Sequence, residues 1–320
     1  MTSSLHLPQL HGGLFLTDSG LETTLIFHDG IELPHFASCT LLLNSDGQKR
    51  VIDYYERHLD LARNTGAGFV LETPTWRASR DWGAKLGLSH EDLDAVNLSA
   101  IGLMKEIRAR YRGSVEPIVI SGNIGPRGDG YVPGEKMSAS AAQDYHAHQI
   151  GLFAGAGADM VSAYTLSYTG EAIGIVKAAE AAGIPCVISF TVETDGRLPS
   201  GETLDAAIGQ VDAETGRAAA YYMINCAHPD HFSHLFTGAP WEQRVRGLRA
   251  NASRCSHEEL NEATELDDGD PDELGRQYAE LVARLPHVNV LGGCCGTDHR
   301  HVAAISAACM DKGAPIAKQV

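Results

Sequence analysis

The sequence predicts a single-domain (β/α)8 barrel, in which eight parallel strands alternate with helices and close into one sheet. Eight short apolar segments, mostly alternating with helical patterns, are spread over the 320 residues of the chain. Polar residues or cysteines end nearly every one of these segments. A barrel brings all eight strand ends to one mouth, so we favour it over the alternative, a doubly wound open sheet.

The apolar segments have the length and the flanking glycines, prolines and polar residues that are typical of buried strands. They cover residues 14–20, 69–75, 117–123, 159–165, 184–192, 220–226, 244–251 and 288–293, of which the seventh is the weakest. The residues at their ends, which we expect at the barrel mouth, are Asp18, Glu72, Asn123, Tyr164, Glu193, Asn225 with Cys226, Asn251, and Cys294 with Cys295.

Helical periodicity fills most of the intervals between these segments. The helical patterns cover residues 45–62, 93–107, 138–156, 171–182, 204–211, 271–285 and 299–309. We expect residues 1–13 to be a loose N-terminal tail, residues 14–313 to form the barrel, and residues 314–320 to be a C-terminal tail. The stretch 124–135 is rich in glycine and proline and is long enough to be a functional loop.

The charge of the chain disfavours two classes of partner. With 41 acidic and 25 basic residues the net charge is -16, and such a surface repels nucleic acid and anionic membranes. No apolar run is long enough for a membrane span, and residues 1–13 lack the pattern of a signal peptide. We therefore expect a cytoplasmic protein with small-molecule partners. Its seven scattered cysteines do not suggest a disulfide framework.

Two adjacent cysteines end the last apolar segment, within the run Gly292-Gly293-Cys294-Cys295-Gly296. Side chains alternate along a regular strand, but a bend at the glycines would let both thiols face one point. Cys226 ends the sixth segment, on the same face of a barrel, and would complete a set of three thiolates suited to zinc. Three protein ligands leave one coordination position open, as in catalytic sites. The alternatives are a structural site completed by His228, or buried cysteines that only fill the core.

Two other functions are compatible with these residues. One is a metal-free enzyme that uses a cysteine nucleophile with His228 as its base. The other is a non-enzymatic protein that buffers zinc, senses thiols, or serves as a partner subunit of a larger enzyme. The polar residues expected around the open mouth of the barrel disfavour the non-enzymatic reading.

Several motifs resemble the homocysteine S-methyltransferase family over almost the whole chain. They are Asn225-Cys226, Gly292 to Gly296, Asp18-Ser19-Gly20 (with Ser in place of a Gly), Glu72-Thr73-Pro74-Thr75, and Gly122-Asn123-Ile124-Gly125-Pro126. The resemblance implies a (β/α)8 barrel, zinc bound by Cys226, Cys294 and Cys295, and transfer of a methyl group to the sulfur of homocysteine, which gives methionine.

The resemblance also implies residues that bind the amino-acid acceptor. Asp18 matches the family's ammonium-binding carboxylate, and the backbone N–H groups of Ser19 and Gly20 are expected to bind the carboxylate. The expected substrate-binding residues are Asp18, Ser19, Gly20, Glu72, Thr73, Asn123, Tyr164 and Asn225. Tyr164 departs from the family, which usually has a second ammonium-binding Glu there. A different thiol acceptor is therefore an alternative, unless Glu72 or Glu193 compensates.

The methyl donor is expected to be a small onium compound, either a sulfonium or betaine, because no folate or cobalamin domain is recognisable in the 320 residues. Aromatic rings attract such cations. The candidates are Trp76, Trp82, Tyr131 and Tyr164, each of which is equally compatible with ordinary packing. Glu22 is expected to start a helix rather than bind a ligand.

Overall fold

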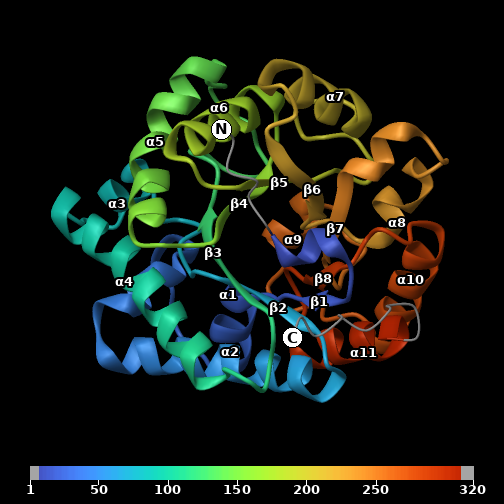
Figure 1. The fold of residues 1–320 in the computed structure, drawn as a ribbon, viewed down its shortest axis with the longest axis horizontal. Coiled ribbons are helices and arrows are strands. Elements are labelled where there is room, and N and C mark those ends of the chain that lie inside the picture. The colour runs from blue at the N-terminus through green and yellow to red at the C-terminus, as the bar shows by residue number, and fades with distance from the viewer. Residues whose placement is uncertain (1–6, 311–320) are drawn as a thin grey trace.

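The computed structural model describes residues 7–310, which form a closed barrel of eight parallel strands with helices outside it (Figure 1). The strands follow one another around the barrel in sequence order, and β1 pairs with β8 to close it. This confirms the predicted fold. Each strand overlaps its predicted segment: β1 Phe15–Leu16, β2 Gly68–Glu72, β3 Ile118–Ile124, β4 Met160–Leu166, β5 Cys186–Phe190, β6 Ala219–Asn225, β7 Val245–Ala250 and β8 Val290–Gly293.

The helices that cover the barrel begin at polar caps or prolines and often end at glycine. Helix α2, for example, starts after Asn44, whose side chain accepts from the Gly47 N–H, and ends at Gly66 with φ 67°. The bounds are α1 Leu21–Thr23, α2 Ser45–Thr65, α3 Arg80–Lys85, α4 His90–Arg110, α5 Ala139–Gly155, α6 Thr169–Ala182, α7 Leu204–Thr215, α8 Pro229–Phe232, α9 His257–Glu262, α10 Pro271–Arg284 and α11 His299–Cys309.

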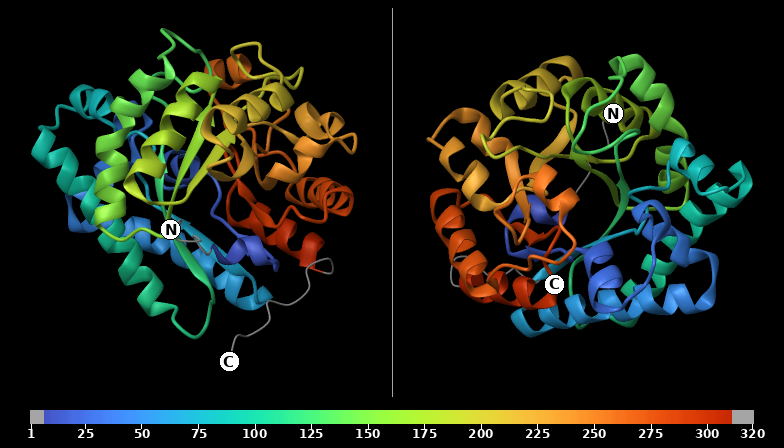
Figure 2. Two further views of the ribbon diagram at one scale, coloured as in Figure 1. Left: turned by 45° about the horizontal axis from the view of Figure 1, so that its top comes forward. Right: turned by 180° about the vertical axis from the view of Figure 1, so that it is seen from behind.

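Two apolar layers hold the barrel together. The larger lies between the strands and the helices, and the smaller fills the inside of the barrel. Helix α11 packs beside α2, so the last helix meets the first long one and completes the outer ring (Figure 2). Within residues 7–310, no helix combines the length and the apolar character that a membrane span requires.

The N-terminal residues that the structure describes are not the loose tail we expected. Leu7 is buried in the interior core, and residues 8–11 form a short 3-10 helix. The Gln9 Nε2 donates to Tyr221 Oη at 3.2 Å and lies 3.3 Å from Met160 Sδ. The segment covers the end of the barrel opposite the cysteines, because burial of Leu7 and these hydrogen bonds outweigh the entropy of a free tail. The other residues that we predicted to be tails, 1–6 and 314–320, lie outside the described residues.

Candidate active site

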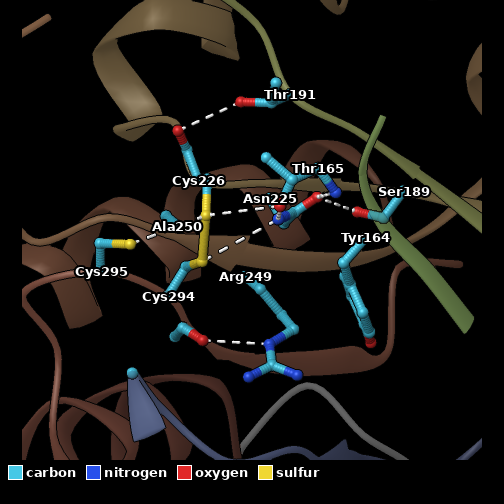
Figure 3. Close-up of a disulfide and its surroundings, with 12 residues drawn as sticks. Tyr164, Thr165, Ser189, Thr191, Asn225, Cys226, Arg249, Ala250, Cys294 and Cys295 are labelled. Atoms are coloured by element: carbon cyan, nitrogen blue, oxygen red, sulfur yellow. Dashed lines mark hydrogen bonds between the residues drawn. A yellow bond between two sulfur atoms is a disulfide. The ribbon is translucent and has the colours of Figure 1, made fainter. Parts of the chain in front are cut away.

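Three cysteines meet at the mouth of the barrel. The Sγ atoms of Cys226, after β6, and of Cys294 and Cys295, after β8, all lie within 4.8 Å of one another. Cys226 and Cys294 are joined as a disulfide, and Cys295 Sγ is 3.9 Å from Cys226 Sγ (Figure 3). The juxtaposition that the sequence predicted is therefore present.

The backbone explains how the thiols reach one point. Cys226 has φ 53°, a left-handed conformation that is uncommon outside glycine and turns its side chain off the line of β6. A Cβ at Gly292 would collide with Thr17, and one at Gly293 would collide with Thr297. Only glycine lets β8 approach β1 this closely, and the approach carries the following cysteines into the mouth.

The donor set fits zinc. Three sulfurs this close, on two strand ends, can surround one borderline-soft cation when all three are thiolates. The disulfide uses two of the same sulfurs, so the metal site requires the reduced chain. Burial raises the pKa of the Cys295 thiol, and a bound cation would reverse that effect by stabilising the thiolate.

His228 is not part of this cluster. Among residues 7–310 the group of possible metal ligands at the mouth contains the three cysteines alone. His228 Nδ1 accepts a hydrogen bond from the Asp230 N–H at 3.2 Å and so caps α8. Burial lowers the pKa of His228 to about 4. The geometry supports neither His228 as a fourth zinc ligand nor His228 as the base of a cysteine nucleophile.

A cavity of about 80 Å³ opens beside the cysteines. Most of the predicted substrate residues line it; Glu72 does not. The lining includes Asp18, Ser19, Gly20, Thr73, Asn123, Tyr164 and Asn225, together with the three cysteines. Glu72 lies next to Tyr164, whose hydroxyl donates to Glu72 Oε1 at 2.9 Å, and burial raises the pKa of this carboxyl to about 7.

Asp18 has a cationic neighbour that we did not predict. Its Oδ1 lies 2.8 Å from Nη2 of Arg249, near the end of β7, and both side chains are less than a tenth exposed. Asp18 Oδ1 has no hydrogen-bond partner among the described residues, so its contact with Arg249 is chiefly an ion pair. Asp18 Oδ2 accepts from the Tyr54 hydroxyl at 3.1 Å. Burial lowers the pKa of nearby His58 to about 4, so that imidazole is neutral at pH 7.

The backbone amides expected to bind the substrate carboxylate are already engaged within the protein. The Ser19 N–H donates to Tyr54 Oη at 3.1 Å, and the Gly20 N–H donates to the Thr297 carbonyl at 3.2 Å. These hydrogen bonds connect the turn to α2 and to the segment after β8, so its two N–H donors are not available to an anion. The expectation for these two amides is wrong for this structure.

Asn225 holds the end of β4 in place. Its Oδ1 accepts from the Thr165 N–H at 2.9 Å and from Ser189 Oγ at 2.6 Å, and its Nδ2 donates to Thr165 Oγ1 at 2.8 Å. Thr165 has φ 61°, so these bonds stabilise a left-handed residue next to the cavity. Asn123, by contrast, has a buried Oδ1 with no hydrogen-bond partner in the described chain and is free to accept from a ligand.

Three of the four predicted aromatic residues line the cavity. These are Trp76, Tyr131 and Tyr164, and Phe36 joins them. The hydroxyl of Tyr131 lies 3.8 Å from Cys295 Sγ. Trp82 lies elsewhere: its ring faces the cationic groups of Arg77 and Lys85, and its indole N–H donates to the Pro126 carbonyl.

Comparisons with known proteins decide the family. The family model described as homocysteine S-methyltransferase matches residues 15–309. The chain belongs to the homocysteine S-methyltransferase family. The family match covers every strand of the barrel and all three clustered cysteines.

Solved structures and a curated relative agree with membership of the homocysteine S-methyltransferase family. The oxidized form of the homocysteine methyltransferase MmuM from Escherichia coli superposes with a TM-score of 0.71 at 20% identity, covering 92% of this chain and 95% of that one. Its metallated form gives 0.69 at 19% identity, covering 92% and 96%. Methionine synthase from Mycobacterium leprae (strain TN) is 29% identical over 207 residues, 57% of this chain. The match spans only 16% of that synthase.

Two functional residues escaped the sequence reasoning. His257, in the first turn of α9, lies between the Cys226 carbonyl, at 2.5 Å from Nε2, and Glu193 Oε1, at 3.1 Å from Nδ1. Arg249 lies one residue before the end of β7. The sequence does contain a signal for Arg249, because a charged residue in an otherwise buried strand segment must find a partner inside the barrel.

Proposed function

We propose that this chain is a zinc-dependent thiol S-methyltransferase that moves a methyl group from a small sulfonium or betaine donor to homocysteine, giving methionine. The observation that carries the proposal is the convergence of Cys226, Cys294 and Cys295 beside a cavity at the barrel mouth. Family membership supports the reaction class. The proposal extends it to the metal, the acceptor and the donor.

The three cysteines would hold the metal in the reduced chain. When bound, zinc lowers the pKa of a thiol that it coordinates, so that the thiol is present as a nucleophilic thiolate. His257 Nε2 donates to the Cys226 carbonyl, and its Nδ1 contacts Glu193, which positions the loop that carries Cys226. The oriented cysteines and the cavity thus place the acceptor sulfur where a donor can reach it.

The transfer balances without an oxidant or reductant. The acceptor sulfur forms a bond to the methyl carbon as the bond from that carbon to the donor's sulfonium sulfur or ammonium nitrogen breaks, and the departing atom keeps the electron pair. The thiol proton leaves to solvent. The chain's own contribution is to bind both molecules in line and to exclude water from the buried mouth.

Aromatic residues support an onium donor. Trp76, Tyr131 and Phe36 border the same cavity as the cysteines, and the Tyr131 hydroxyl lies 3.8 Å from Cys295 Sγ, so a methylated cation held by these rings would lie close to the thiolates. A sulfonium donor loses its positive charge in the reaction, and its thioether product therefore binds the rings less tightly than the substrate does.

The test is methionine formation by the zinc-loaded, reduced protein. Homocysteine is supplied with S-methylmethionine, S-adenosylmethionine, dimethylsulfoniopropionate or betaine in separate reactions, and methionine is measured by mass spectrometry. We expect turnover with at least one of these donors and none with Cys294→Ala. A zinc-loaded protein that gives no methionine with any of the four would refute the proposal.

A further inference from the structure

The cavity contains an ion pair whose two members face the same space. Arg249 and Asp18 both line it, with Arg249 Nη2 2.8 Å from Asp18 Oδ1. The guanidinium is oriented by the protein itself, because Nε donates to the Gly293 carbonyl at 3.0 Å and Nη2 to the Ser19 carbonyl at 3.1 Å. Figure 3 shows this side chain on the same side of the cysteines as Tyr164.

Tyr164 lies beside Arg249, with its ring next to the guanidinium. The guanidinium carbon lies 4.9 Å from the centre of the Tyr164 ring, within range of a cation–π contact that leaves the positive charge unneutralised. The Tyr164 hydroxyl donates to Glu72 Oε1 at 2.9 Å and also lies within hydrogen-bonding reach of Arg249. A glutamate at position 164 would instead offer Arg249 a second carboxylate and occupy the guanidinium.

The charges around the cavity favour an acceptor that is a zwitterion. Asp18 and Arg249 cancel, whereas three thiolates around a divalent cation leave one negative charge at the neighbouring site. A thiol bearing only a carboxylate would add a further negative charge to this buried region, and a thiol bearing only an amine would leave Arg249 without a second anion. An α-amino acid offers both charges and adds none.

We propose that Arg249 binds the carboxylate of the acceptor amino acid while Asp18 binds its ammonium group, so that the pair is a clamp for a zwitterion. This assignment rests on the proposed methyl transfer to homocysteine and specifies how the acceptor is recognised. It gives the substrate carboxylate a partner, since the Ser19 and Gly20 amides are engaged elsewhere. Nε and Nη2 of Arg249 already meet protein oxygens, so the acceptor carboxylate would pair with Nη1 through a charge-assisted hydrogen bond.

The clamp is tested with methylated ligands that need neither zinc nor turnover. Methionine carries both charges, 3-(methylthio)propylamine lacks the carboxylate, and 4-(methylthio)butanoate lacks the ammonium group. Calorimetric titration should show wild-type protein binding methionine at least about tenfold more tightly than either truncated ligand. Arg249→Met should weaken methionine binding by about 10- to 100-fold and change binding of the propylamine by less than about threefold. Asp18→Asn should weaken methionine but spare the butanoate.

Two further variants keep the test decisive. Arg249→Lys retains the charge without the planar guanidinium that the Gly293 and Ser19 carbonyls orient, and it should give an intermediate loss; it also covers the case in which Arg249→Met fails to fold. Arg246→Met, on the same strand but bonded to the Gln9 and His287 carbonyls at the closed end, should leave the preference among the three ligands unchanged. Equal weakening of methionine and the propylamine by the Arg249 variants, or tight propylamine binding by wild type, would overturn the clamp.

Transfer assays separate this inference from the proposed function. If wild-type protein shows the charge-dependent binding but does not methylate homocysteine, the proposed function fails and the clamp stands. If it methylates homocysteine and Arg249→Met lowers kcat/KM equally for homocysteine and 3-mercaptopropylamine, the clamp fails and the proposed function stands.

Discussion

Arg249 Nη2 lies 2.8 Å from Asp18 Oδ1, joining the seventh strand to the turn after the first across the mouth of the barrel. Both side chains are less than a tenth exposed, so the pair is shielded from water. Breaking it by removing one partner would leave an uncompensated buried charge, which costs about 3–5 kcal/mol. The carboxylate that we propose to bind the acceptor is therefore held beside a fixed cation.

Metal content is the first prediction. The reduced protein should bind about one zinc ion per chain, and Cys294→Ala should lose most of it because one of three ligands is removed. Plasma emission analysis after dialysis measures the ratio. Cys255→Ala, at an exposed free cysteine away from the cluster, serves as the matched control. Full zinc content in Cys294→Ala would contradict the three-cysteine site.

Oxidation state should control the same site. Because the disulfide uses Cys226 and Cys294, an oxidised preparation should bind little zinc and should recover binding after treatment with a thiol-free reductant. Zinc titration before and after reduction, with free thiols counted in parallel, makes the measurement. Equal zinc binding by the oxidised and reduced protein would exclude these two sulfurs as ligands.

Position 164 should distinguish two ways of binding the acceptor. From the sequence alone, Tyr164→Glu is expected to improve homocysteine use, because it restores the family's second carboxylate. The neighbouring Arg249 reverses that expectation, since the new carboxylate would compete with the substrate for the guanidinium. We expect kcat/KM for homocysteine to fall by about tenfold or more, mostly through KM. Tyr164→Phe keeps the ring and is the control; improved kcat/KM in the Glu variant would contradict the clamp.

Glu72 should make stability depend on pH. Burial raises its pKa from 4.5 to about 7 in the folded chain, so the folded state binds a proton that the unfolded state has already released. The stabilising effect of this bound proton is complete below about pH 4.5 and is lost as the pH rises through about 7. Glu72→Gln should therefore be more stable than wild type by up to about 3 kcal/mol at pH 8, and this difference should shrink toward pH 5.

Urea unfolding at several pH values measures the Glu72 effect. Glu180→Gln, on the exposed side of α6, is a matched control that should not alter the pH dependence. A constant difference between Glu72→Gln and wild type from pH 5 to pH 8 would show that the carboxyl titrates at an ordinary pH in the folded chain.

Donor binding should depend on the aromatic residues at the cavity. Trp76→Ala should raise the KM for the onium donor by about three- to thirtyfold and leave the KM for homocysteine within a factor of about two, because Trp76 lines the cavity and is not one of the two clamp residues. Trp82→Ala is the matched control, since Trp82 packs against Arg77 and Lys85 away from the cavity. Equal effects of the two substitutions on the donor KM would remove the case for an aromatic donor site.

The sequence by itself determined the barrel and the meeting of the cysteines. Both follow from local rules: apolar strand segments alternate with amphipathic helices, and the ends of parallel strands share one face. Cys226 and Cys294 are 68 residues apart, yet their places at the ends of the sixth and eighth strands predict their contact.

The tertiary structure alone decided which charged groups pair inside the mouth. Arg249 lies opposite Asp18, and Tyr164 turns its hydroxyl to Glu72, because of the exact stagger of strands and the rotamers that packing allows. The Ser19 and Gly20 amides were expected to be free, but they bond to Tyr54 and Thr297, from a helix and a loop far away in sequence. A strand pattern states which face a residue occupies, whereas its partner depends on every neighbouring element that packs against that face.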